Sequence, residues 1–358
     1  MKILSVVGAR PNFMKIAPII RAISAADSDV EQVLVHTGQH FDEKMSDVFF
    51  RELELPKPDE HLGISGGSHA TQTANIMIEF EPVLLRHKPD WLVVVGDVNS
   101  TVACALVASK LGVPIAHVEA GLRSRDRGMP EEINRLVTDA IADLLLTPSP
   151  DGDENLIAEG VPQEKIRCVG NVMIDSLIRA LPKIEQSNAL STMELEPGGY
   201  VLATLHRPSN VDEPNMLAEL IGALNKISET LPIVFPVHPR TRARLKDNNI
   251  QVAPGIMMVD PLGYFDFMSL MKSAKVVMTD SGGVQEETTY LGVTCLTVRP
   301  NTERPITIDE GTNRLVQPGK ESLLAAWAEI QANPPKPRCP ELWDGKAAER
   351  IAQVLLNR

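Results

Sequence analysis

Three carboxylates in the first half of the sequence stand where an acid and a base could act on one substrate. Asp97 ends the apolar run WLVVVGD, and Glu119 ends the next run, VPIAHVEAG. Carboxylates at adjacent strand ends converge in space, so their proton affinities can be pushed apart to give a general acid and a general base. Glu131 follows Pro130 at a predicted helix start, where an acidic residue is common for structural reasons, so its spacing alone favours a structural role.

Histidines end two apolar runs in the second half of the chain. His206 follows YVLATL, and His238 follows PIVFPV. An imidazole can carry a proton or contact an anionic ligand. Two histidines at equivalent strand ends leave a structural role and a role toward a shared ligand both open. His36 and His40 lack the glutamate and the helical context of an HExxH site, and we expect no metal site there.

Two glycine-containing turns could bind phosphate groups through their backbone. The turn GARPNFMK carries Arg10 and Lys15 at a strand-to-helix junction, where free N–H groups and the helix dipole attract anions. The turn DSGGVQEE places Gly282 and Gly283 after Ser281, and a glycine pair there is costly unless something approaches the backbone closely. Without a ligand, the same residues would form a solvated turn with surface cations and a well-capped helix.

The two commonest fingerprints of nucleotide binding are missing, because neither GxGxxG nor GxxxxGK[ST] occurs in the sequence. A nucleotide would instead be held by the DSGGVQEE turn. Its N–H groups would take phosphate oxygens, and Glu286 or Glu287 could take the ribose hydroxyls.

The elements that must position these residues follow from the alternation of short apolar runs with amphipathic stretches, which is typical of βαβ units around a parallel sheet. The apolar runs predict strands at 2–9, 31–38, 90–97, 113–121, 143–149, 200–207, 232–238, 255–261, 275–283 and 293–298. The amphipathic stretches predict helices at 12–26, 69–87, 99–111, 131–142, 213–230 and 283–291. Since these strands are too many for one compact sheet of ordinary size, we predict an α/β protein with two Rossmann-like domains and a cleft between them.

The domain boundaries are predicted from the polar, Pro- and Gly-containing interruption at 182–199 and the strand pattern around it. We expect an N-terminal Rossmann-like domain at 1–168 and a C-terminal one at 169–345. A last helix at about 346–358 is expected to pack back on the first domain. Ligands bind outside the carboxyl ends of strands in parallel sheets, so the site is expected in the cleft between the domains.

Composition and charge exclude several classes of protein. Lys and Arg number 35 against 47 Asp and Glu, and the net charge of −12 argues against a nucleic-acid partner, whose phosphates basic residues would have to neutralise. Three Trp, three Tyr and eight Phe are too few for a stacking platform. No apolar stretch approaches the roughly 20 residues of a membrane span, and the apolar run at the start is too short for a signal peptide. The four cysteines show no CxxC or zinc-ribbon spacing, so we expect buried thiols in a soluble cytoplasmic protein without a membrane partner.

Eleven motifs occur in order between residues 8 and 316: GARPNFMK, TGQH, VVGDVNST, HVEAGLRS, MPEEINR, GNVMIDSL, LHRPSNVD, PVHPRT, TDSGGVQEE, NTERPIT and GTNRLV. Together they closely resemble the non-hydrolysing UDP-N-acetylglucosamine 2-epimerases, which have a two-domain GT-B glycosyltransferase-like fold. The resemblance covers nearly the full chain.

The resemblance implies an isomerase that interconverts UDP-N-acetylglucosamine and UDP-N-acetylmannosamine without NAD, metal or another cofactor. A base removes the C2 proton as UDP leaves C1, and UDP adds back to the 2-acetamidoglucal after reprotonation on the other face. The family also implies a homodimer that supplies a nucleotide sugar for polysaccharide biosynthesis.

The resemblance further implies roles for individual residues. The catalytic residues would be Asp97, Glu119, Glu131 and His206, the histidine lying near the diphosphate. The substrate-binding residues would be Arg10 and Lys15 in the phosphate region, Ser281, Gly282 and Gly283 in the diphosphate loop, Glu287 at the ribose, Phe267 and the backbone of Leu262 at the uracil, Arg304 at the nucleotide, and His238.

The exact UDP-sugar is left open. Relatives that act on modified sugars such as UDP-2,3-diacetamido-glucuronate share the GARP and DSGG motifs, and a GT-B glycosyltransferase would hold UDP in the same way. A non-catalytic UDP-sugar sensor would bind without exchange. Residues 63–68 and 122–130 depart from the allosteric members where an activating UDP-sugar binds, so we expect weak or absent activation by UDP-N-acetylglucosamine.

Overall fold

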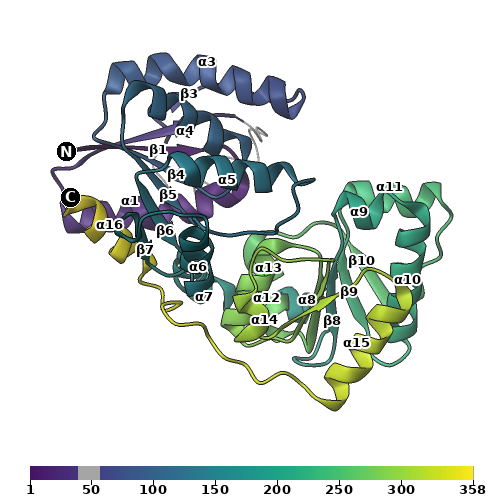
Figure 1. Ribbon diagram of the computed structural model, residues 1–358. Helices are drawn as coiled ribbons and strands as arrows, with labels where there is room; N and C mark the ends of the chain where they lie inside the picture. Colours follow the sequence, from purple (N-terminus) through teal and green to yellow (C-terminus); the bar gives the residue numbers. More distant parts are fainter. Residues whose placement is uncertain (39–56, 358) are drawn as a thin grey trace. The chain divides into compact units, whose positions relative to one another are not determined.

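The computed structural model describes residues 1–38 and 57–357 of the chain (Figure 1). The protein divides into two compact units: unit 1 comprises Met1–Ser176 and Glu341–Arg358, and unit 2 comprises Leu177–Pro340. Each unit is built on its own parallel sheet, as the alternation of apolar and amphipathic stretches predicts. Among the described helices, none combines the length and the apolar character that crossing a bilayer requires.

Unit 1 contains a seven-stranded parallel sheet in the order β3-β2-β1-β4-β5-β6-β7. Its strands are β1 (Lys2–Val7), β2 (Glu31–His36), β3 (Glu60–His61), β4 (Trp91–Val95), β5 (Ile115–Val118), β6 (Leu144–Thr147) and β7 (Ile166–Cys168). The strands β4, β5 and β6 are buried along their whole length, which is the pattern of a parallel sheet covered on both faces.

Two layers of helices cover this sheet. The α-helices of unit 1 are α1 (Arg10–Ala26), α3 (His69–His87), α4 (Asn99–Leu111), α5 (Pro130–Ile141), α6 (Pro150–Ala158), α7 (Val172–Ile184) and α16 (Ala347–Leu356). Successive residues of a strand point to opposite faces. Ile3 therefore packs with α1 and α16 in one core, while Leu4 packs with α3 and α4 in the other.

The boundary between the units lies within α7, after Ser176, whereas the sequence places it after Cys168. The first turn of α7 belongs to unit 1 because its residues pack there. Val172 joins the core of α1 and α16, and Asp175 accepts hydrogen bonds from the N–H groups of Ala347 and Ala348 at 3.2 and 2.7 Å. The helix α16 thus starts beside α7 and packs on α1.

Unit 2 contains a six-stranded parallel sheet in the order β10-β9-β8-β11-β12-β13. Its strands are β8 (Val201–Thr204), β9 (Ile233–Pro236), β10 (Ile256–Val259), β11 (Val276–Thr279), β12 (Cys295–Val298) and β13 (Asn313–Val316). Its helices are α8 (Ala189–Thr192), α9 (Pro208–Val211), α10 (Pro214–Ser228), α11 (Pro239–Asp247), α12 (Tyr264–Ser273), α13 (Gly282–Leu291), α14 (Ile306–Asp309) and α15 (Lys320–Ala332). The strands and the helices α10 and α15 share one apolar core.

The strand order reverses once in each sheet, around β1 in unit 1 and around β8 in unit 2. In doubly wound sheets, ligands bind outside the carboxyl ends of the strands at such a switch point. The turns that follow β1 and β4 carry the start of α1 and Asp97, and the turns that follow β8 and β11 carry His206 and the DSGG residues. Most of the residues singled out from the sequence therefore lie at the two switch points.

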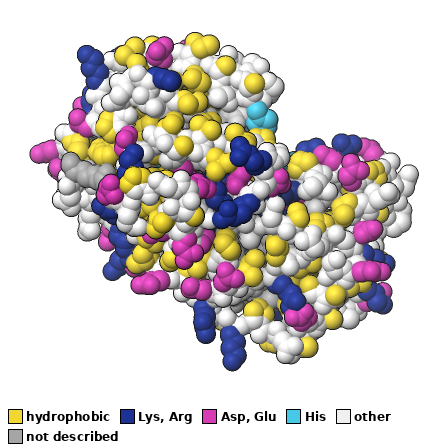
Figure 2. Space-filling view, viewed as in Figure 1, with side chains coloured by type: hydrophobic (Ala, Val, Ile, Leu, Met, Phe, Trp, Pro, Cys, Tyr) yellow, Lys and Arg dark blue, Asp and Glu magenta, His cyan; other side chains and the backbone are white. Residues whose placement is uncertain are grey.

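All the strands predicted from the sequence are present, and β3, β7 and β13 are additional. These three carry polar or charged residues, as in Asn313–Val316, and so lack an apolar run. The surface agrees with the mixed composition: on the face drawn in Figure 2, acidic side chains are interspersed with basic ones.

Candidate active site

A buried ion pair lies at the carboxyl edge of the sheet in unit 1. Lys15 on α1 and Glu119, the residue after β5, contact each other through Nζ and Oε2, and their side chains are only 8% and 6% exposed. Gly96, with φ of 69°, lies against this pair: a methyl group on it would be 3.0 Å from Lys15 Nζ and 3.4 Å from Glu119 Oε2. Only glycine leaves room for the pair in this conformation.

Asp97 is held by the helix α5. Arg135 Nη1 donates to Asp97 Oδ2 at 2.5 Å, and Asn134 Nδ2 donates to the Asp97 carbonyl at 2.9 Å. The Asp97 side chain remains 29% exposed, while that of Arg135 is 2% exposed. The cation is thus fixed inside the protein, and the carboxylate it holds stays accessible to a ligand.

Glu131 and Glu132 divide the roles that the start of α5 offers. Glu132 is buried and accepts hydrogen bonds from the N–H groups of Ser124 and Arg125, both at 2.9 Å, and from Arg135 Nη2 at 2.8 Å. Burial would raise the pKa of Glu132, but these hydrogen bonds hold it below its usual value. Glu131 takes part in none of them and is half-buried, so the structural role expected at this helix start falls to its neighbour.

Asp280 organises the corresponding edge in unit 2. It is fully buried and follows β11. Its oxygens accept hydrogen bonds from His206 Nδ1 at 2.7 Å, from the N–H groups of His206 and Arg207 at 3.0 and 2.9 Å, and from Asn210 Nδ2 at 3.1 Å. Burial would raise the pKa of Asp280, but these partners hold it below its usual value. The sequence analysis treated Asp280 only as a helix cap, although its place at the end of KVVMTD was a signal for a site residue.

The DSGG turn opens α13 directly after Asp280. Ser281 is the N-cap residue, and its N–H bonds Thr279 Oγ1 at 3.0 Å. Gly282 lies close to Arg304, whose Nη1 would be 3.1 Å from a methyl group at that position. Arg304 Nε also contacts the buried Glu286 at 2.8 Å. The arginine therefore stands over the first turn of the helix, where unpaired N–H groups are expected.

Glu287 is 6% exposed and accepts a hydrogen bond from the Tyr264 hydroxyl at 3.3 Å. Glu286 is tied to Arg304, so of the two acids that follow the DSGG turn, Glu287 is the one turned toward α12. Phe267 lies on α12 and is half-buried, as is Leu262 in the loop before that helix.

His238 lies apart from His206 on the next strand of the sheet. It is exposed at the N-cap of α11, where its Nδ1 accepts from the Arg240 N–H at 3.2 Å. The two histidines occupy equivalent strand ends, but no hydrogen bond joins them in the described part of the chain. Arg10 is the first residue of α1. Gln39 and His40 of the TGQH motif lie outside the described residues.

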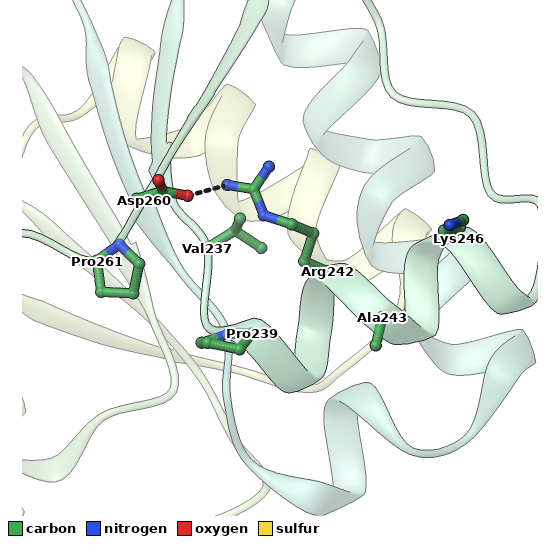
Figure 3. Close-up of a pocket in the computed structure, with 7 residues that line it drawn as sticks. All are labelled: Val237, Pro239, Arg242, Ala243, Lys246, Asp260 and Pro261. Carbon is green, nitrogen blue, oxygen red and sulfur yellow. Dashed lines mark hydrogen bonds and ion pairs between the residues drawn. The ribbon is translucent and has the colours of Figure 1, made fainter.

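A pocket of about 420 Å³ lies between the end of β9, the helix α11 and the loop after β10 (Figure 3). It is lined by Val237, Pro239, Arg242, Ala243, Lys246, Asp260 and Pro261. Arg242 and Asp260 face each other across it at 3.0 Å. None of the residues selected from the sequence lines this pocket. Among the described residues, no group of three or more His, Cys, Asp or Glu is arranged to hold a metal ion.

Comparison with known proteins relates these residues to a family. The family model of UDP-N-acetylglucosamine 2-epimerase matches residues 22–356. The chain is 43% identical to the UDP-N-acetylglucosamine 2-epimerase of Methanocaldococcus jannaschii over an alignment of 364 residues that covers 99% of each chain. A crystal structure of the M. jannaschii UDP-GlcNAc 2-epimerase in complex with UDP-GlcNAc and UDP superposes with a TM-score of 0.90 at 43% identity, covering 100% of both chains.

Two other relatives bear on substrate and fold. The chain is 40% identical over 358 residues to the UDP-2,3-diacetamido-2,3-dideoxy-D-glucuronate 2-epimerase of Pseudomonas aeruginosa, with 99% of each chain covered. The structure of the glycotransferase of kitacinnamycin matches with a TM-score of 0.59 at 10% identity over 99% of this chain and 98% of that one, a likeness of fold alone. The two-domain fold is therefore GT-B-like, and the chain belongs to the UDP-N-acetylglucosamine 2-epimerase family, whose members are isomerases.

Proposed function

We propose that this chain interconverts UDP-N-acetylglucosamine and UDP-N-acetylmannosamine by epimerisation at C2, without a metal or a redox cofactor. The observation that carries the proposal is the cluster in unit 1, where the Lys15–Glu119 pair lies against Gly96, the residue before Asp97. Two carboxylates with separate cationic partners can give and take protons at one substrate. The M. jannaschii relative, whose structure holds UDP-GlcNAc and UDP, supports the choice of substrate.

In the proposed reaction, a base removes the C2 proton while the bond from C1 to the UDP oxygen breaks. The electrons of the C2–H bond form the C1=C2 double bond, and those of the C1–O bond leave with UDP, giving a 2-acetamidoglucal. An acid then delivers a proton to the opposite face of C2, and UDP adds back to C1. We assign these proton transfers to Asp97, Glu119 and Glu131, because inversion requires groups on both faces of the sugar.

Departure of UDP places negative charge on the diphosphate, and donors must meet that charge. In unit 2, His206 and Arg304 are available for this purpose. Asp280 contacts His206 Nδ1, so Nε2 is the ring nitrogen left for a ligand. The Ser281 N–H is already bonded, so this residue would offer its hydroxyl, while the N–H groups of the first turn of α13 face the phosphates. In unit 1, Arg10 and Lys15 would add positive charge near the start of α1.

The space around Gly283 supports a ligand at this turn. Its backbone does not have a positive φ, and a methyl group on it would meet nothing within 4 Å. Neither conformation nor packing in the described protein requires glycine there, and glycine in a helix costs roughly 0.5–1 kcal/mol relative to alanine. A phosphate that approaches the backbone is a physical reason for the residue. We place the ribose at Glu287, the uracil at Leu262 and Phe267, and the remaining part of the ligand near His238.

We further propose that the protein is a cytoplasmic homodimer whose UDP-binding domain is the Rossmann-like region within 169–345. The family resemblance supports both the dimer and the compartment. Ile78 and Leu85 support the dimer because these apolar side chains on α3 are 64% and 52% exposed and lie seven residues apart, on one face of the helix. Light scattering would measure the mass, and Ile78→Glu should shift it toward the monomer.

The proposed reaction is tested by incubating the full chain in deuterium oxide with UDP-N-acetylglucosamine, UDP-N-acetylmannosamine or UDP-2,3-diacetamido-glucuronate. Deuterium at C2 of the first two recovered sugars is the expected result. Exchange only in the third would assign the chain to the reaction of the P. aeruginosa relative. UDP-sugar binding without exchange in any of the three would refute epimerisation.

The Asp97→Asn variant tests the role of the carboxylates in the same assay. Asparagine keeps the shape of the side chain but cannot accept a proton, so exchange should fall below detection while UDP still binds. Full exchange by this variant would remove Asp97 from the mechanism. Asp260→Asn, a change at an exposed ion pair in unit 2, is a control that should exchange normally.

A further inference from the structure

A buried carboxylate, Asp139, lies directly behind the turn that carries Glu119. Asp139 belongs to α5 and is 3% exposed. Its Oδ1 contacts His117 Nδ1 at 2.6 Å, and its Oδ2 accepts from the Gly121 N–H at 3.1 Å and from Arg123 Nη1 at 2.7 Å. His117 and Gly121 stand two residues before and two residues after Glu119. One carboxylate therefore holds both sides of this turn.

His117 is fully buried, and both of its ring nitrogens contact acceptors. Nε2 lies 2.8 Å from the Gly96 carbonyl oxygen, and Nδ1 faces Asp139. Burial would raise the pKa of Asp139, but the charge and hydrogen bonds of His117 and Arg123 hold it below its usual value, so the carboxyl is ionised. A carbonyl and a carboxylate can only accept hydrogen bonds. Both ring nitrogens therefore donate, and the imidazole carries a hydrogen on each.

The carbonyl that His117 binds belongs to the peptide between Gly96 and Asp97. Gly96 is also the residue against which Lys15 and Glu119 pack, with 3.0 and 3.4 Å between those side chains and a methyl group placed on it. A rotation of this peptide would move Asp97 and disturb the Lys15–Glu119 pair at the same time. The hydrogen bond from His117 resists that rotation.

The backbone of Glu119 also needs this support. Its φ is 70°, in the left-handed region that costs a residue with a side chain roughly 1–2 kcal/mol. Such a conformation persists only where the surroundings over-determine it. The Glu119 N–H bonds the Leu146 carbonyl at 3.0 Å, and Asp139 binds the residues on either side.

The charges around Asp139 balance within the protein. Arg123 joins Asp139 to Glu159, with which it forms two hydrogen bonds of 2.8 and 2.6 Å. Two cations, His117 and Arg123, thus alternate with two carboxylates. Without the charge of Asp139, the two cations would face each other in a buried site, which is strongly unfavourable.

We infer that Asp139, acting through a doubly protonated His117, is a positioning residue for the proton transfers at C2. It sets the Gly96–Asp97 peptide and the Glu119 turn so that Asp97, Glu119 and Lys15 meet one substrate. The inference rests on the proposed epimerisation. Asp139 and His117 lie behind the reacting groups and do not touch the substrate.

The test compares the unaltered chain with the variants Asp139→Asn and His117→Gln in the deuterium exchange assay. A displacement of about 1 Å at reacting groups costs on the order of 100-fold in rate, so kcat of Asp139→Asn should fall by about that factor with KM and UDP affinity little changed. Glutamine can still donate to Gly96 but carries no charge, so His117→Gln should retain more activity than Asp139→Asn. Asp143→Asn is the matched control, because Asp143 accepts from the Ile115 N–H at 3.0 Å at the opposite end of β5. It should keep the kcat of the unaltered chain.

A structural readout separates this inference from the proposed function. In the unaltered protein labelled with ¹⁵N-histidine, NMR should find a hydrogen on both ring nitrogens of His117, whether or not the chain epimerises any sugar. A ring with a single hydrogen, or a kcat in either folded variant equal to that of the unaltered chain, overturns the inference. If Asp139→Asn does not fold, His117→Gln decides. If the unaltered chain shows no C2 exchange, the proposed function fails, and the NMR result alone judges His117.

Discussion

Replacing Asp280 by asparagine tests whether this carboxylate organises the edge of unit 2. Asparagine has the same shape, but one oxygen becomes an NH₂ group that can only donate. In the better orientation, the remaining oxygen keeps the N–H groups of His206 and Arg207 and the amide of Asn210, while the NH₂ group faces His206 Nδ1. The variant thus loses one charge-assisted hydrogen bond and the charge that strengthens the other three.

The magnitude follows from this count of contacts. A hydrogen bond to a charged group contributes about 1.5–3 kcal/mol and a neutral one about 0.5–1.5 kcal/mol. One lost bond and three weakened ones would together cost up to about 5 kcal/mol, from which the smaller cost of burying a neutral amide is subtracted. We therefore expect a loss of about 2–4 kcal/mol in the free energy of unfolding of unit 2.

The loss should also depend on pH in a defined direction. The pKa of Asp280 is lowered in the folded protein, so its ionised form stabilises the fold above the pKa of an unfolded aspartate, about 3.9. That contribution disappears as the pH falls through the folded pKa. The difference between the unaltered chain and Asp280→Asn should therefore shrink in acid.

The assay is urea unfolding followed by ¹⁹F NMR of the protein labelled with 5-fluorotryptophan. The chain has three tryptophans, of which Trp327 belongs to unit 2 and Trp91 and Trp343 to unit 1, so each unit reports on itself. Asp260→Asn, at a side chain 92% exposed, is the control and should leave the Trp327 transition unchanged. A shift for Asp280→Asn below about 0.5 kcal/mol would refute the reasoning.

Four further predictions follow from single contacts. Lys15→Met leaves the buried Glu119 without its cation, so it should abolish C2 exchange and lower the melting temperature, whereas the same change at Lys2, whose partner Glu31 is 61% exposed, should do neither. Gly283→Ala should raise the stability slightly and weaken UDP binding in calorimetry, since its methyl group meets nothing in the free protein; unchanged affinity would argue against a close approach of phosphate to the backbone. Burial raises the pKa of Asp175 to about 6, so its contribution to stability is greatest below the unfolded pKa and is lost as the pH rises through about 6; the destabilisation by Asp175→Asn should accordingly be smaller near pH 8 than near pH 4.5. Progress curves from UDP-N-acetylmannosamine should show no lag, and a strong lag relieved by added UDP-N-acetylglucosamine would contradict the weak activation expected from residues 63–68.

Much of the fold could be predicted because parallel strands buried on both faces must be apolar runs. The pattern therefore located every central strand and the helices between them. It missed β3, β7 and β13, whose residues are mixed and whose strand conformation depends on pairing with a neighbour. It also placed the domain boundary before α7, because nothing in a helical pattern tells which sheet its first turn packs against.

The candidate site was predicted less evenly. Residues at strand ends, such as Asp97, Glu119 and His206, could be selected from their positions, and the family resemblance added Phe267 and Arg304. The assignment of Glu131 rather than Glu132 to the site came from the resemblance, and the hydrogen bonds of Glu132 give a physical reason for it. These site assignments remain predictions for the assays above.

The sequence by itself determined the two parallel sheets, the carboxyl edges that carry the polar residues, and the family. These features depend on local periodicity and on motifs whose residues are close along the chain. Only the tertiary structure decided the partners: Lys15 with Glu119, Arg135 with Asp97, Asp280 with His206, and Asp139 with His117. Most of these pairs join residues from different βα units, and burial makes each pair strong and its separation costly, so their choice depends on how the units pack rather than on any local pattern.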